Sequence, residues 1–338
     1  MRHRLTTYCL LMLICTSAPA PGQLMPNLGG QRVGISALQF LKIGAGARGV
    51  GMGESFVAVV NDASALYYNP AGAVECAGNQ VLFSHTAYVA DIAHEFLGVV
   101  YHLSAQDALG LSVTALHMED MEITTETQPF GTGRYFTFGD VAVGATYARK
   151  MTDQFSFGAT VKYVEETLDV LKMRAFLVDL GTLYWTGLGS TRFAVAITNF
   201  GGEVSPEGSA TTFDGTRMED FDSFSPPIDF KLGFALDPIS TEDHLLTASL
   251  QLNHPSDNSE HVRIGVEYTW GQIFSIRGGV KRTFRQPLFG EDGSSEESYA
   301  LGTGVRVGLG VTTVIFDYAF AQFGRLGEVH RVSLALTF

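Results

Sequence analysis

Three glycines have a spacing that could do chemistry. Gly44-x-Gly46-x-x-Gly49 matches the pattern with which dinucleotide-binding proteins hold a pyrophosphate, and Asp62 follows where such proteins place the acid that binds the ribose. That site needs a helix directly after the glycines, but the run 56–60 is strand-like. We therefore predict no nucleotide cofactor and interpret the glycines as means of turning the backbone tightly in a confined space: Gly44, Gly46, Gly49, Gly51 and Gly53.

Other reactive residue types are scattered. The histidines have no metal-binding spacing, and neither HExxH nor GxSxG occurs. Cys76 has no histidine nearby and is interpreted as a small packed side chain. We predict that the chain is not an enzyme and has no metal, catalytic residue or other cofactor.

The first 22 residues have the features of a secretory signal peptide. Arg2 and Arg4 precede a short apolar run at 5–15, and small residues follow at 17–22. A retained membrane anchor is the alternative. Cleavage changes the formal net charge from −13 to −15, because it removes these two arginines and no acid; a charge of this sign argues against a nucleic-acid partner. It also leaves one cysteine, so we expect no intramolecular disulfide and look to a closed barrel for stability.

From about residue 79, segments of roughly ten residues alternate with a period of two. In the stretch 155–163, Phe155, Phe157 and Val161 share one face with an alanine and a tyrosine, while Ser156 and Lys162 share the other with a glycine and a threonine. The same pattern recurs at 228–236, 262–270 and 314–320. We count about fourteen such segments, an even number as in bacterial outer-membrane barrels.

The connections alternate in length. Those after the even-numbered segments are short, near 104–107, 150–153, 187–190, 237–242, 271–272 and 309–312, whereas 118–136, 201–225 and 284–298 are long. The chain ends on an alternating strand whose apolar face is typical of a barrel-assembly signal: Val332, Leu334, Leu336 and Phe338. We predict an all-β, transmembrane, antiparallel up-and-down barrel; a soluble β-sandwich or solenoid is the alternative.

In such a barrel the long loops face outward and both mature termini are periplasmic. The loops 201–225 and 284–298 are acidic, which fits either a solvated rim or a docking surface for a basic partner or a divalent cation. The charges expected to point inward are mixed in sign, and we predict that they pair across strands: Lys162, Asp179, Lys231, Arg263, Glu267, Arg277, Arg306, Asp317 and Arg331.

The stretch Asp62-Ala-Ser-Ala-Leu-Tyr-Tyr68-Asn69-Pro70-Ala-Gly72 is predicted to be a helical stub over 63–68, with Asp62 as its N-cap and Pro70 ending it. A helix this short needs support from its surroundings. We therefore predict that 23–78 is a hatch or plug inside a barrel formed by 79–338. Whether it opens or only fills the lumen stays undecided at this point.

This stretch resembles the hatch motif of FadL-type outer-membrane transporters, and residues 40–74 resemble the PorV/PorQ family. Asn61 and Tyr68 depart mildly from the expected acid and tryptophan. The resemblance implies a fourteen-stranded barrel in the outer membrane, in contact with its lipid and associated with type IX secretion. It implies that the chain docks exported cargo proteins bearing a C-terminal β-sandwich signal, or a larger translocon barrel. The alternatives are a passive transporter of hydrophobic small molecules and a structural barrel whose paralogues carry the function.

Overall fold

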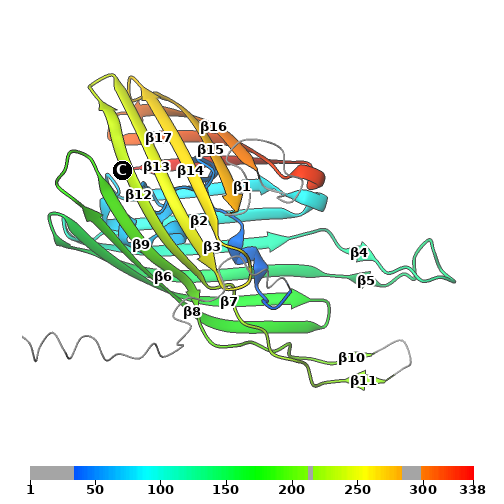
Figure 1. The fold of residues 1–338 in the computed structure, drawn as a ribbon. Coiled ribbons are helices and arrows are strands. Elements are labelled where there is room, and N and C mark those ends of the chain that lie inside the picture. The colour runs from blue at the N-terminus through cyan, green and yellow to red at the C-terminus, as the bar shows by residue number, and fades with distance from the viewer. Residues whose placement is uncertain (1–33, 212–215, 284–297) are drawn as a thin grey trace, which may run out of the picture.

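The computed structural model describes residues 34–211, 216–283 and 298–338. Within them, fourteen strands form one closed barrel (Figure 1). They are β1 (Gln80–Ala87), β2 (Ala93–His102), β3 (Asp107–His117), β6 (Phe138–Thr152), β7 (Phe155–Leu168), β8 (Leu171–Trp185), β9 (Arg192–Phe200), β12 (Asp229–Ser240), β13 (His244–Pro255), β14 (His261–Trp270), β15 (Phe274–Thr283), β16 (Tyr299–Leu309), β17 (Thr312–Gln322) and β18 (Glu328–Thr337).

The barrel is antiparallel and up-and-down, as predicted. Each strand pairs with the next along the barrel, and β1 pairs with β18 from Gln80↔Thr337 to Ala87↔His330, which closes the sheet. Closure removes the unpaired edges that an open sheet would expose.

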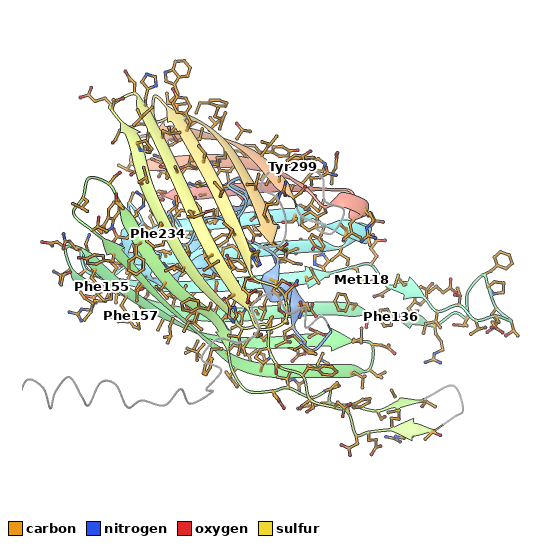
Figure 2. All side chains as sticks on the ribbon, viewed as in Figure 1. Met118, Phe136, Phe155, Phe157, Phe234 and Tyr299 are labelled. Atoms are coloured by element: carbon orange, nitrogen blue, oxygen red, sulfur yellow. The ribbon has the colours of Figure 1, made fainter. Side chains whose placement is uncertain are left out.

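The two faces of the wall separate as the alternation predicts. On β7, Ser156 is buried while Phe157 is 38% exposed, and on β12 Lys231 is buried while Phe234 is 46% exposed. Figure 2 shows Phe155, Phe157 and Phe234 pointing away from the barrel. An apolar outer wall and a small or polar inner wall suit strands that separate lipid from a filled lumen.

The six short connections lie where they were expected, although β6 and β12 run a few residues further, to Thr152 and Ser240. Two of the long loops carry small two-stranded sheets: β4 (Met121–Glu122) with β5 (Tyr135–Phe136), and β10 (Ala210–Thr211) with β11 (Arg217–Met218). Both project from the end of the barrel opposite the C-terminus (Figure 1). Short 3₁₀ turns, η3 (Val89–Asp91) and η4 (Gly324–Leu326), lie in two shorter connections. The predicted signal peptide and all but the last residue of the loop 284–298 lie outside the described residues.

The residues before β1 form short helices: η1 (Gln39–Lys42), α2 (Ala47–Gly51), α3 (Ala65–Tyr68) and η2 (Pro70–Glu75). We call residues 34–79 the N-terminal segment. It packs against strands on several sides of the barrel, including β3, β6, β7, β8 and β15–β18. Its buried residues supply much of the apolar core, including Phe56, Leu66 and Tyr68.

Three local predictions for this segment are wrong. The run 56–60 forms turns, with the N–H groups of Val59 and Val60 both donating to the Phe56 carbonyl, because its apolar side chains are buried in the lumen and not in a sheet. Helix α3 begins at Ala65, after Ser64, and Asp62 does not cap it but accepts a hydrogen bond from the Ser64 N–H. A five-residue helix does follow Gly46, too short to form the dinucleotide site.

Candidate functional site

The glycines of the N-terminal segment allow its backbone to approach the wall. Gly53 has φ +62°, and a Cβ there would lie 2.8 Å from the Val280 nitrogen. On β15, a Cβ at Gly279 would collide with the backbone of Met52 and Gly53. The Cα of Gly302 would be 3.0 Å from a Cβ at Gly51. Small residues on both sides therefore let backbone meet backbone.

The other predicted glycines make room within the segment. A Cβ at Gly49 would lie 2.7 Å from the Tyr68 ring, and one at Gly44 would lie 2.9 Å from the Tyr68 hydroxyl and collide with the Glu54 carboxylate. Gly46 has φ +75° and precedes α2. Tyr68 itself is 2% exposed, with its ring edge-on to Phe56.

Asn69 and Pro70 form the second contact with the wall. The buried Asn69 amide donates to the carbonyls of Val57 (2.9 Å) and Thr182 (3.1 Å), and its oxygen accepts from the Ala71 N–H. Asn69 is extended (φ −161°), so α3 ends before Pro70 as predicted. Pro70 then begins η2, a helix that the sequence reasoning missed although proline is favoured at this position.

Arg48 is the main electrostatic link between the segment and the wall. Its guanidinium donates to both Glu267 oxygens on β14 at 2.8 and 2.9 Å, to Asp62 at 2.8 Å and to Asn61 at 2.6 Å. Burial alone would lower the pKa of Arg48, but Glu267 and Asp62 outweigh it and raise that pKa above its ordinary value. The arginine therefore remains charged at any physiological pH.

Two further ion pairs tie the segment to the barrel. Glu54 pairs with Arg263 on β14, and Lys42 pairs with Asp257 at 3.0 Å. The prediction that inward charges pair across strands is therefore only half right. Lys162–Asp179 and Glu267–Arg277–Asp317 do link strands, but Arg263 and Glu267 also bind the N-terminal segment.

The remaining charged residues that were predicted to point inward differ in their contacts. Lys231 is 3.9 Å from Asp229 and lies over the Tyr67 ring, and Arg331 donates to Thr86. Arg306 is exposed at the rim of a cavity.

Polar wall residues that sequence reasoning did not single out also hold the segment. Gln251 accepts hydrogen bonds from the Phe56 and Val57 N–H groups at 3.0 and 2.9 Å. Ser333 accepts from the Ala47 N–H, and Arg192 donates to the Ala58 carbonyl. Their only sequence signal is a polar side chain on the inner face of a strand, which does not identify the partner.

Cavities lie on both sides of the N-terminal segment. One of about 460 Å³ reaches the short-turn rim, where Arg48, Asp62 and His244 line it. Two others, of about 480 and 400 Å³, are lined by Glu54, Tyr88 and Phe323 near the long-loop rim. Cys76 is buried at the end of η2, and burial raises the pKa of its thiol. Among the described residues, no cluster of metal-binding side chains and no helix able to cross a membrane occurs.

The C-terminal strand lies where an assembly signal would be accessible. Val332, Leu334 and Leu336 face outward, and each is 38–44% exposed. The Phe338 N–H donates to the Asn79 carbonyl at 2.9 Å, and its side chain is 60% exposed.

Solved structures similar to this one are FadL-like barrels. The CymD monoaromatic hydrocarbon channel has a TM-score of 0.58 at 13% identity, covering 88% of this chain and 98% of its own. The toluene transporter TodX of Pseudomonas putida gives 0.57 at 14%, covering 91% and 98%. A FadL homologue of Pseudomonas aeruginosa gives 0.52 at 14%, covering 87% and 98%. At this identity the similarity establishes the fold alone.

The comparison with curated protein sequences gave no significant match. The family model described as type IX secretion system protein PorV matches residues 27–254, two thirds of the chain. Together with the closed FadL-like barrel, this indicates an outer-membrane protein associated with type IX secretion. The chain belongs to the PorV family.

Proposed function

We propose that this barrel is a docking protein of type IX secretion. Its ligands are exported proteins with a C-terminal β-sandwich signal, or a larger translocon barrel, and it performs no chemistry on them. The observation that carries the proposal is the PorV family match over residues 27–254.

The long-loop extensions are the surfaces we assign to docking. The β4–β5 extension carries Glu119, Asp120, Glu122 and Glu126 against Arg134 alone, and Phe130 near its tip is 98% exposed. An exposed aromatic ring among acids suits a basic partner with an apolar pocket. The β10–β11 extension, with Glu219 and Asp220 beside Arg217, has the same sign of charge.

The N-terminal segment acts in this proposal as the hatch, keeping the lumen closed while cargo is bound outside. The extensions then face the cell exterior and both mature termini face the periplasm. The C-terminal end of β18 at the short-turn rim supports this orientation.

The test is gentle detergent extraction of the tagged protein from its own membrane, followed by mass spectrometry of its partners. We expect exported proteins sharing a β-sandwich domain, or a very large barrel. Phe130→Ala should reduce their recovery, whereas Leu188→Ala, which changes another exposed apolar side chain (77%) at the opposite rim, should not. Equal recovery with both variants would contradict docking through the β4–β5 extension, and recovery of lipid alone would contradict docking altogether.

A second candidate is passive transport of hydrophobic small molecules. The similar structures described as a toluene transporter and a monoaromatic hydrocarbon channel favour it, as does the partly apolar cavity of about 480 Å³. Toluene entry into proteoliposomes at a rate above that of empty liposomes would support this candidate.

A further inference from the structure

Two carboxylates meet in the cavity of about 480 Å³ without a cation beside them. Asp140 on β6 and Glu166 on β7 are direct cross-strand partners, and both line this cavity. Like charges directly opposite on two strands repel each other. Across the described residues, no ion pair is found for either carboxylate. We propose that this pair binds the ammonium or guanidinium group of an otherwise apolar ligand.

The hydrogen bonding of the two acids leaves capacity for a donor. Asp140 is 6% exposed, and its Oδ1 has no hydrogen-bond partner, although the Thr167 backbone N–H contacts the carboxyl group. Glu166 accepts one hydrogen bond, 2.8 Å from the Leu38 N–H. A buried acceptor without a donor is costly, so a ligand that donates hydrogen bonds and carries positive charge would be stabilised here.

The basic residues that share this cavity are engaged elsewhere. Lys42 pairs with Asp257, and Arg331 donates to Thr86; Lys281 also has a partner of its own. Arg331 is four strand positions from Asp140, through Thr86, His94 and Leu116, which is roughly 19 Å along the wall. The third acid of the cavity, Glu54, pairs with Arg263.

The remaining surroundings of the pair are apolar. Leu38, Phe40, Leu116 and Phe138 belong to one hydrophobic cluster beside it, and all four line the cavity. A volume of about 480 Å³ is within the range of small-molecule sites. A divalent cation would need about six oxygen ligands, more than these two acids provide, so a charged nitrogen on an apolar body fits better.

The ligand is thus a free amine or a basic side chain of a bound polypeptide, and the same site chemistry serves both. We would measure binding of n-hexylamine and n-hexanol to the full-length protein in nanodiscs by calorimetry. A second pair of probes is an acetylated leucine-rich hexapeptide with one lysine and its norleucine counterpart.

We expect at least one charged probe to bind ten- to a hundredfold tighter than its neutral counterpart. Binding of hexylamine alone identifies a free amine, and binding of the lysine peptide identifies a protein side chain. The double variant Asp140→Asn/Glu166→Gln should lose the preference. Glu165→Gln should keep it, because Glu165 is already held by Lys172 and Arg174 on the outer face.

Equal binding of charged and neutral probes would overturn the proposal, as would an unchanged preference in the double variant. Folding is checked by heat-modifiable migration on gels. If the double variant does not fold, the single variant Asp140→Asn is tested in its place. The assignment would then be refuted if the affinity ratio of charged to neutral probe fell by less than threefold. Removing the repulsion should also raise the unfolding midpoint of the unliganded barrel, and a lowered midpoint would contradict an uncompensated pair.

Discussion

Replacement of Arg48 by methionine tests whether ion pairs hold the N-terminal segment in the lumen. The methionine preserves much of the apolar stem but removes the four hydrogen bonds to Glu267, Asp62 and Asn61. Glu267, whose side chain is only 5% exposed, would lose one of its two arginines, while Arg277 remains 2.5 Å away.

Removing one partner of a buried ion pair costs about 3–5 kcal/mol. The lower end applies because Arg277 still neutralises Glu267 and the Arg48 side chain is 19% exposed. If the conformation in which the segment is bound in the lumen is destabilised by about 3 kcal/mol, the population of the displaced conformation rises by on the order of a hundredfold. The double variant Arg48→Met/Glu267→Gln should be less perturbed than the sum of its two single variants, since neither charge is then left alone.

The assay is hydrogen exchange of the amides of residues 46–68, together with single-channel conductance in a planar bilayer. Faster exchange and open-channel events are expected in Arg48→Met. The control is Arg174→Met, which removes an exposed ion pair with Glu165 and should change neither readout. Exchange rates and conductance equal to those of the wild type would refute the claim that Arg48 holds the segment in place.

Three other outcomes are expected. Gly279→Val should destabilise the barrel by about 1–3 kcal/mol, seen as a lower unfolding midpoint on heat-modifiability gels, because the valine Cβ would collide with the backbone at Met52. The control is Gly278→Val, whose Cβ would have its nearest contact 3.8 Å away. Burial raises the pKa of the Cys76 thiol, so little thiolate exists at pH 8 and iodoacetamide should label Cys76 only after unfolding; equal labelling rates before and after would disprove this. Deletion of Phe338 should reduce the amount of folded barrel in the membrane, and normal amounts of heat-modifiable protein would argue against an assembly role.

The wall of this barrel could be predicted from sequence because each strand residue meets one of two environments. Because successive strand residues face lipid and lumen in turn, apolar and polar side chains alternate with a period of two. The buried Ser156 and the exposed Phe157 illustrate the two faces. Turn positions followed from where the alternation stops.

The contents of the lumen could not be predicted in the same way, because they depend on contacts between distant parts of the chain. Arg48 and Glu267 are 219 residues apart, and Leu38 meets Glu166 across 128 residues. The start of α3 and the turns at 56–60 depend on how these residues pack inside the barrel, and this packing overrides the secondary-structure preference of the local sequence. Asp140 and Glu166 face each other only through the register of β6 on β7. Composition and alternation thus determined a fourteen-stranded wall, whereas the partners of each inward side chain were decided by barrel closure around the N-terminal segment.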